Sequence, residues 1–341
     1  MSEASDNERE ALKAPFSTFY NTELMPHLLE LEEERKEIKN TLIFPAVGIG
    51  ILVVILIFIL PNLGIQSLIL AGITATGLWV WFKTKASKDY TAKFKTQIIG
   101  NILKYINPKF TYSPYGRLDR NEFVSTGIFN RQPDRYQGQD LISGKDDQTV
   151  FSFSEVNAQY YTKDHKGRRT LNTLFKGLMF KADFHKDFKN RTVILPDAGE
   201  KYFGSVGRAL QKLNFSRPDV VTMENVDFEK EFVVYSSDPQ EARYLLSPSF
   251  MEKLLACKNR LNTDISLSFH RSSIYIAMPI SKEFFEPSIF STIIDANKTE
   301  LYFKDMEMVL EIIDELNLNT RIWSKMPTFE EPKIKNTNRI I

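Results

Sequence analysis

The sequence predicts an α+β fold in which an N-terminal transmembrane helical hairpin precedes a mixed, mostly antiparallel β-sheet domain with flanking helices. Three observations predict it. Two long uncharged runs lie between residues 42 and 82, short alternating apolar runs begin after residue 107, and helical patterns interrupt them without a regular strand–helix–strand rhythm. We expect five segments, at residues 1–41, 42–82, 83–106, 107–319 (with a subdivision near 200) and 320–341.

The two uncharged runs, from Leu42 to Leu60 and from Ile65 to Phe82, contain no Asp, Glu, Lys, Arg or His. Each would span roughly 27–28 Å as a helix, close to the roughly 30 Å hydrocarbon core of a bilayer. The turn between them is too short for a domain, so the sequence predicts a tight two-pass hairpin in a lipid bilayer. Basic residues flank its outer ends and are absent from its turn, so we expect both termini and the main domain to be cytoplasmic.

Helical patterns continue beyond both ends of the hairpin. Residues 16–40 carry a heptad-like apolar stripe with one charged interruption at Arg35, and acidic residues on the other face. Residues 83–106 carry apolar residues four apart among lysines; these are Tyr90, Phe94, Ile98 and Ile102.

These two helices leave the same membrane face, which predicts an antiparallel stalk with an acidic side against a basic side. The candidate pairing residues are Glu33, Glu34, Lys88 and Lys93. An alternative is that the lysines bind anionic lipid headgroups at roughly 1 kcal/mol each, and the two arrangements can coexist.

The segment from residue 107 onward predicts the sheet domain. Strands are expected at 149–156 (continuing through 159–162), 173–184, 191–195, 228–235, 265–269 and 273–278, and a strand or its start at 122–129. Helices are expected from Asp238 and Pro239 to about 246, resuming after Ser247-Pro248 to 261, and at 301–316. Residues 198–213 also have a helical pattern. We expect the tail from residue 320 to be loosely ordered.

Three groups of phrases occur in order after the hairpin: residues 136–144 (YQGQDLISG) with 151–155 (FSFSE), residues 175–180 (FKGLMF) with 183–184 (DF) and 192–197 (TVILPD), and residues 232–238 (FVVYSSD) with 242–246 (ARYLL). With the hairpin, they resemble a bacterial family known only as a domain of unknown function, DUF 3137, over about residues 16–316. The resemblance implies a bacterial inner-membrane protein. It brings no activity and no catalytic residue, and it hints at a LemA-like membrane protein as a partner.

The sequence offers no recognisable chemistry. Residues 138–145 are similar to a phosphate-binding loop, but the spacing is one residue too long and Asp146 replaces the magnesium-binding hydroxyl, so an ordinary loop is expected. The four histidines form no metal-binding spacing, and Cys257, the single cysteine, is expected to be a buried structural thiol. Glu286-Pro287 is expected to be a packing turn without chemistry. We therefore assign no catalytic, cofactor-binding or metal-binding residue and no cofactor.

The net charge of the part after the hairpin argues against a nucleic-acid partner but does not indicate a function. The part after the hairpin has a modest excess of six positive charges, which does not predict nucleic-acid binding. The leading hypothesis is a membrane-anchored cytoplasmic binding or assembly module of unknown ligand, which binds another membrane protein or itself. The alternative is a membrane-tethered enzyme that acts on a lipid-derived or peptide substrate. Because the sequence contains no recognisable catalytic motif, we favour a protein that is not an enzyme and leave the enzyme as the alternative.

Overall fold

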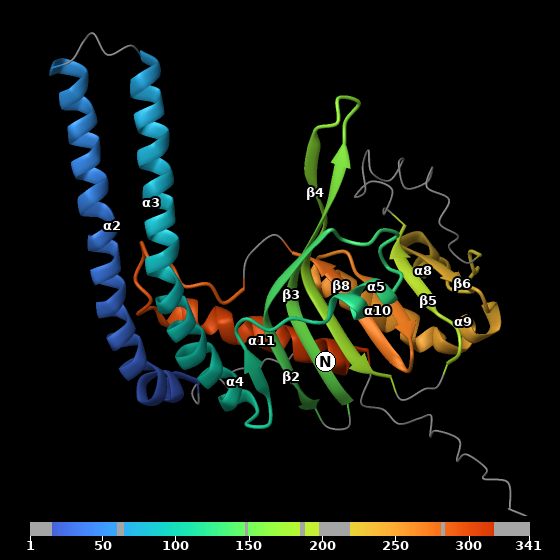
Figure 1. Ribbon diagram of the computed structural model, residues 1–341. Coiled ribbons are helices and arrows are strands. Elements are labelled where there is room, and N and C mark those ends of the chain that lie inside the picture. The colour runs from blue at the N-terminus through green and yellow to red at the C-terminus, as the bar shows by residue number, and fades with distance from the viewer. Residues whose placement is uncertain are drawn as a thin grey trace, which may run out of the picture.

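The protein combines two long helices with a single large sheet. The computed structural model describes residues 16–59, 65–146, 149–184, 188–197, 219–280 and 284–316. In this part of the chain the helix pair stands beside an eight-stranded sheet, and shorter helices cover the sheet (Figure 1). The α+β class expected from the sequence is confirmed.

The helix pair is formed by α2 (Met25–Ile59) and α3 (Ile65–Phe94). A π-helix, η1 (Tyr20–Leu24), precedes α2, and α3 continues through a second π-helix, η2 (Lys95–Ile99), into α4 (Gly100–Ile106). The helices predicted on both sides of the hairpin are thus confirmed. The predicted stripe residues are buried: Leu24, Leu28, Leu31, Leu42, Tyr90, Phe94, Ile98 and Ile102.

The predicted membrane hairpin coincides with the distal halves of α2 and α3. Ile65 begins α3, whereas Leu60 and the turn at 61–64 lie outside the described residues, as do many side chains of both runs. Among the residues that the structure describes, no helix combines the length and the apolarity that a membrane crossing requires.

The sheet has the strand order β1-β2-β3-β4-β8-β7-β5-β6, and every neighbouring pair is antiparallel. Its strands are β1 (Thr111–Ser113), β2 (Arg135–Asp146), β3 (Thr149–Lys163), β4 (Arg169–Asp183), β5 (Thr192–Pro196), β6 (Phe232–Ser236), β7 (Ser266–His270) and β8 (Ser273–Pro279). The strands predicted at 149–162 and 173–184 form the antiparallel pair β3–β4, and those predicted at 265–269 and 273–278 form the pair β7–β8. Strands from both sides of residue 200 belong to this one sheet.

Five shorter helices complete the described part of the domain: α5 (Arg120–Ser125), α8 (Val226–Glu231), α9 (Pro239–Leu245), α10 (Pro248–Leu261) and α11 (Ala296–Glu315). The predicted cap of α9 is confirmed, because the Asp238 carboxylate accepts hydrogen bonds from the N–H groups of Gln240 and Glu241. The Ser247 hydroxyl caps α10 in the same way. The predicted helix at 198–213 and the tail from 320 lie outside the described residues.

One predicted strand is wrong and another is right only in its second half, because side-chain caps start helices there. Residues 122–129 were expected to be extended, but Asp119 accepts hydrogen bonds from the N–H groups of Asn121 and Glu122 and begins α5. The expected strand at 228–235 is half helix, because Asn225 caps the N–H of Phe228 at 2.9 Å and α8 precedes β6. In both places local capping outweighs the β-propensity of the sequence.

The phrase similar to a phosphate-binding loop lies in strand β2, so the expected loop is wrong. Gly138 and Gly144 allow neighbouring atoms to approach the backbone of β2 closely. A Cβ at Gly138 would overlap the backbone oxygen of Glu155, and a Cβ at Gly144 would overlap the ring of Phe110. The spacing of these glycines therefore reflects the neighbours of β2 in the sheet.

Two apolar cores cover the two faces of the sheet. The larger core joins one face, including Phe153 and Phe180, to α10, α11 and the base of the helix pair. The smaller core packs α5 against the other face through Phe123 and Val156. The helix pair is therefore part of the same packed unit as the sheet.

Candidate functional site: two buried ionic joints

Two buried ionic clusters fasten the helix pair to the domain, and both use the segment at 284–295 between β8 and α11. We call the first the arginine joint, which consists of Glu32, Arg35 and the backbone at 289–293. We call the second the lysine joint, which consists of Lys95, Asp140 and Glu286.

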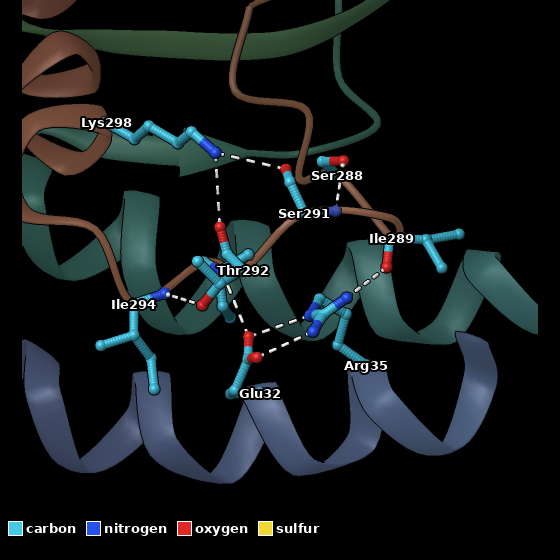
Figure 2. Close-up of polar contacts among 9 residues, drawn as sticks. Glu32, Arg35, Ser288, Ile289, Ser291, Thr292, Ile294 and Lys298 are labelled. Atoms are coloured by element: carbon cyan, nitrogen blue, oxygen red, sulfur yellow. Dashed lines mark hydrogen bonds and ion pairs between the residues drawn. The ribbon is translucent and has the colours of Figure 1, made fainter. Parts of the chain in front are cut away.

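The arginine joint begins with two side chains one helical turn apart on α2. The guanidinium of Arg35 donates to both carboxylate oxygens of Glu32, at 2.9 and 2.8 Å, and also donates to the carbonyl of Ile289 at 2.5 Å. The same carboxylate accepts the backbone N–H of Ile293 at 3.2 Å. Figure 2 shows the pair reaching from the helix to this loop, whose backbone it holds at two points.

Electrostatics keep the arginine joint charged. The hydrogen bonds from Arg35 hold the pKa of the Glu32 carboxyl below its usual value, against the opposing effect of burial. The hydrogen bonds to Glu32 likewise raise the pKa of Arg35. A bidentate, charge-assisted pair of this kind also fixes direction, so Glu32 and Arg35 set where the loop lies on the helix.

The lysine joint lies where α3 passes into η2. The Lys95 ammonium is 2.9 Å from Asp140 Oδ2 and 2.6 Å from Glu286 Oε1, and its side chain is only 1 % exposed. The Tyr112 hydroxyl donates to the other oxygen of Asp140 at 2.5 Å. Gln139 donates to Glu286 at 3.0 Å and to Glu155 at 3.2 Å. One lysine thus connects the helix pair to a strand and to the 284–295 segment.

Two backbone irregularities direct the side chains of Lys95 and Asp140 toward each other. Strand β2 shifts register between Gln139 and Ile142, and Asp140 adopts φ 59° in this bulge. The π-helix η2 begins at Lys95, and a π-turn adds a residue to the helical turn, which rotates the following face. The structure therefore uses one irregularity in the strand and one in the helix to build the joint.

The charges of the lysine joint are unbalanced, with two carboxylates around one ammonium. Burial and, to a lesser extent, Glu286 raise the pKa of Asp140 to about 6, although Lys95 and Tyr112 act in the opposite direction. Burial opposes the charge of Lys95, but its pKa is nevertheless raised because Asp140 and Glu286 surround it. The joint therefore holds a lysine cation beside a carboxyl group whose pKa is raised to about 6.

The four predicted stalk charges are only partly brought together. Lys93 lies 2.8 Å from Glu34, and this pair is partly exposed to solvent. Glu33 and Lys88 are both exposed, and no ion pair of theirs occurs among the described contacts. Glu286, which the sequence predicts in a packing turn, also contributes a carboxylate to the lysine joint.

The sequence contains only a partial signal for the joints. Arg35 interrupts an apolar stripe with Glu32 three residues before it, which is the spacing of an intrahelical pair. Lys95 and Asp140 are 45 positions apart, and nothing in the sequence shows that a bulge and a π-turn bring them together.

The described residues contain no group of three His, Cys, Asp or Glu side chains arranged to hold a metal. His165 lies in the exposed β3–β4 turn, whereas burial and nearby arginines lower the pKa of His270 at the end of β7. His185 lies outside the described residues. Cys257 is buried in α10, as expected.

Comparison with known proteins identifies a family for part of the chain. Residues 173–318, from β4 to α11, match the family described as "Protein of unknown function (DUF3137)". No curated protein matches the chain. Among solved structures, the crystal structure of the mycobacterial trehalose monomycolate transport factor A, TtfA, is similar over 67 % of this chain and 96 % of its own, with 9 % sequence identity and a TM-score of 0.34.

The family match covers two of the three groups of phrases that carried the resemblance, and the first group, at 136–155, lies before it. It includes Glu286 and the loop of the arginine joint, whereas Glu32, Arg35, Lys95 and Asp140 precede it. The resemblance to this family of unknown function, expected over about residues 16–316, is therefore confirmed for residues 173–318.

Proposed function

We propose that this protein is a two-pass protein of the bacterial inner membrane that holds its α+β domain on the cytoplasmic face as a binding or assembly module. Membrane insertion is supported by the two uncharged runs and their basic flanks. The side-by-side course of α2 and α3 also supports it, since the Trp79 indole donates to the Leu42 carbonyl at 3.1 Å.

The observation that carries the assembly role is the pair of buried joints. A domain on a flexible tether samples many orientations, whereas two charged clusters and a shared apolar core fix this domain to its helices. Fixed geometry lowers the entropic cost of binding a partner that is itself held in the membrane. Buried ionic contacts favour one defined arrangement over several similar ones.

The partner that suits this arrangement is another membrane protein, such as a LemA-like protein, or a second copy of this chain. Crosslinking of the full-length protein in its native membrane, followed by purification in detergent, tests this proposal. We expect one dominant membrane partner or a crosslinked homo-oligomer. The Lys95→Met variant should reduce its yield several-fold at equal expression, because the domain loses its fixed orientation.

A crosslinking pattern with no reproducible partner and no self-association would contradict the assembly role. An exposed control variant, Lys230→Gln, should leave the crosslinking yield unchanged, because the pair that Lys230 makes with Asp227 is exposed to solvent. Turnover of a lipid-derived or peptide substrate by the purified protein would instead favour a membrane-tethered enzyme.

A further inference from the structure

The loop of the arginine joint carries an exposed aromatic side chain that neither joint uses. Phe290 lies between Ile289 and Ser291 and is 47 % exposed. The residue before it is held by Arg35, and Ile293, three residues after it, is held by Glu32. Since its backbone is fixed on both sides, Phe290 cannot easily withdraw into the core.

Phe290 lies at the level where the uncharged runs end. The Lys83 ammonium, the first charge after the second run, is 5.3 Å from the Phe290 ring centroid and 5.7 Å from that of Trp79. The Trp79 indole in turn bonds to Leu42, the first residue of the first run. Figure 1 accordingly shows the orange segment before α11 against the middle of the helix pair.

We propose that the loop at 288–292 is a third membrane contact, in which Phe290 enters the interfacial region of the bilayer beside α2 and α3. Phenylalanine on a membrane-surface segment inserts at the boundary of headgroups and acyl chains, and lysines near helix ends extend to the same region. Ser288 and Thr292 are exposed, and their hydroxyls suit a headgroup environment. The occupant of this surface is the lipid itself. The contact would fix the domain against the membrane in addition to the joints, and it rests on the proposed membrane insertion.

Spin labels on single introduced cysteines test this contact in full-length protein reconstituted into vesicles of phosphatidylethanolamine and phosphatidylglycerol. The sites are Phe290→Cys, Val54→Cys in the first uncharged run and Val226→Cys at the exposed start of α8, remote from the helix pair. The native Cys257 is 1 % exposed, so unsubstituted protein gives the labelling background. The measurement is the ratio of collisions with oxygen, which concentrates in lipid, to collisions with a water-soluble nickel chelate.

We expect the ratio at Phe290→Cys to exceed the ratio at Val226→Cys several-fold and to remain below that at Val54→Cys, because the interfacial region is less apolar than the hydrocarbon core. An aqueous ratio at Phe290→Cys with a lipid ratio at Val54→Cys would overturn the third contact and leave membrane insertion intact. Aqueous ratios at both sites would contradict both proposals. A label at Phe290→Cys that neither reagent reaches would overturn the lipid contact in favour of a protein partner.

Discussion

Lys95 joins distant parts of the chain, because its buried ammonium holds the carboxylates of Asp140 and Glu286. It is buried next to Phe94, a residue of the predicted stripe. The apolar side chains predicted at every fourth position from Tyr90 to Ile102 are all buried. However, the π-turn at Lys95 adds a second buried row, which consists of Lys95, Ile99 and Leu103. A spacing rule based on regular helices cannot anticipate that row.

Replacing Lys95 with methionine should destabilise the protein strongly. The apolar stem is retained, but Asp140 and Glu286 lose their cation, and removing one partner of a buried pair typically costs about 3–5 kcal/mol. Thermal unfolding of the full-length protein in detergent, followed by circular dichroism, should show a clearly lowered Tm.

The double variant Lys95→Met with Asp140→Asn provides the control for the ionic interaction. If the loss arises from an uncompensated carboxylate, the second substitution should recover part of the Tm. A double variant that loses the sum of the two single effects would contradict direct coupling between Lys95 and Asp140.

Asp140 should give the protein a characteristic pH dependence. Its pKa is raised to about 6 in the folded protein, above the ordinary value of an aspartate, so folding favours the protonated carboxyl. The contribution of this group to the free energy of unfolding should therefore increase as the pH falls from 7 towards 4. Wild type should gain stability relative to Asp140→Asn over this range, by an amount on the order of 2 kcal/mol. Parallel Tm curves for the two proteins would contradict this titration.

At the scale of elements, the segment at 284–295 determines how the helix pair meets the domain. It follows β8, contributes Glu286 to one joint and its backbone to the other, and leads into α11. Helix α11 adds an aromatic contact, since Phe303 lies 5.0 Å, ring to ring, from Phe16 at the base of the pair. These contacts predict that the segment and the helices unfold together.

The arginine joint should protect the 284–295 segment from hydrogen exchange. Arg35→Met removes the guanidinium, leaves Glu32 buried without its cation, and frees the Ile289 carbonyl. We expect faster exchange at the Ile293 amide, measured by mass spectrometry of peptides from this segment, and a lower Tm. Lys93→Gln, which removes only the exposed pair with Glu34, should change neither quantity measurably. Equal effects of the two variants would contradict the special role of the buried joint.

Two glycines provide a matched test of backbone packing. Gly144→Ala should lower the Tm, because its Cβ would overlap the ring of Phe110. Gly100→Ala should raise stability by about 0.5–1 kcal/mol, since Gly100 is helical and a Cβ there meets no atom closer than 3.8 Å. The reverse order of the two Tm values would show that β2 does not pack against Phe110 as described.

The sequence predicted those elements whose local signals agree with their surroundings. The Asp238-Pro239 start of α9, the break at Ser247-Pro248 and the β7–β8 hairpin are examples, because a cap, a proline and a turn each act locally. Strand β2 was missed because its glycines suggest a loop, whereas their role depends on Phe110 and on Glu155 across the sheet. The two joints were also missed, because the residues that form them, such as Lys95 and Asp140, are far apart in the sequence.

At the scale of the whole molecule, the sheet domain is held against a helix pair that we propose to anchor in the membrane. The ion pair between Lys93 and Glu34 on the helix pair is partly exposed to solvent. The ion pairs of the two joints, at the base of the helix pair, are buried. We therefore expect charge reversal of Glu33 and Glu34 to have a small effect on stability, in contrast to substitutions in the joints. Tm values of the Glu33→Lys and Glu34→Lys double variant and of Lys95→Met, measured in parallel, check this order.

The central claim is the two-pass arrangement with a cytoplasmic domain, and cysteine labelling in spheroplasts tests it most directly. The variants are Asn62→Cys, between the two uncharged runs, and His165→Cys, in the exposed β3–β4 turn. Buried Cys257 keeps the background low. We predict that a membrane-impermeant maleimide labels Asn62→Cys in intact spheroplasts and His165→Cys only after lysis. Labelling of Asn62→Cys only after lysis, or of His165→Cys in intact spheroplasts, would contradict the account.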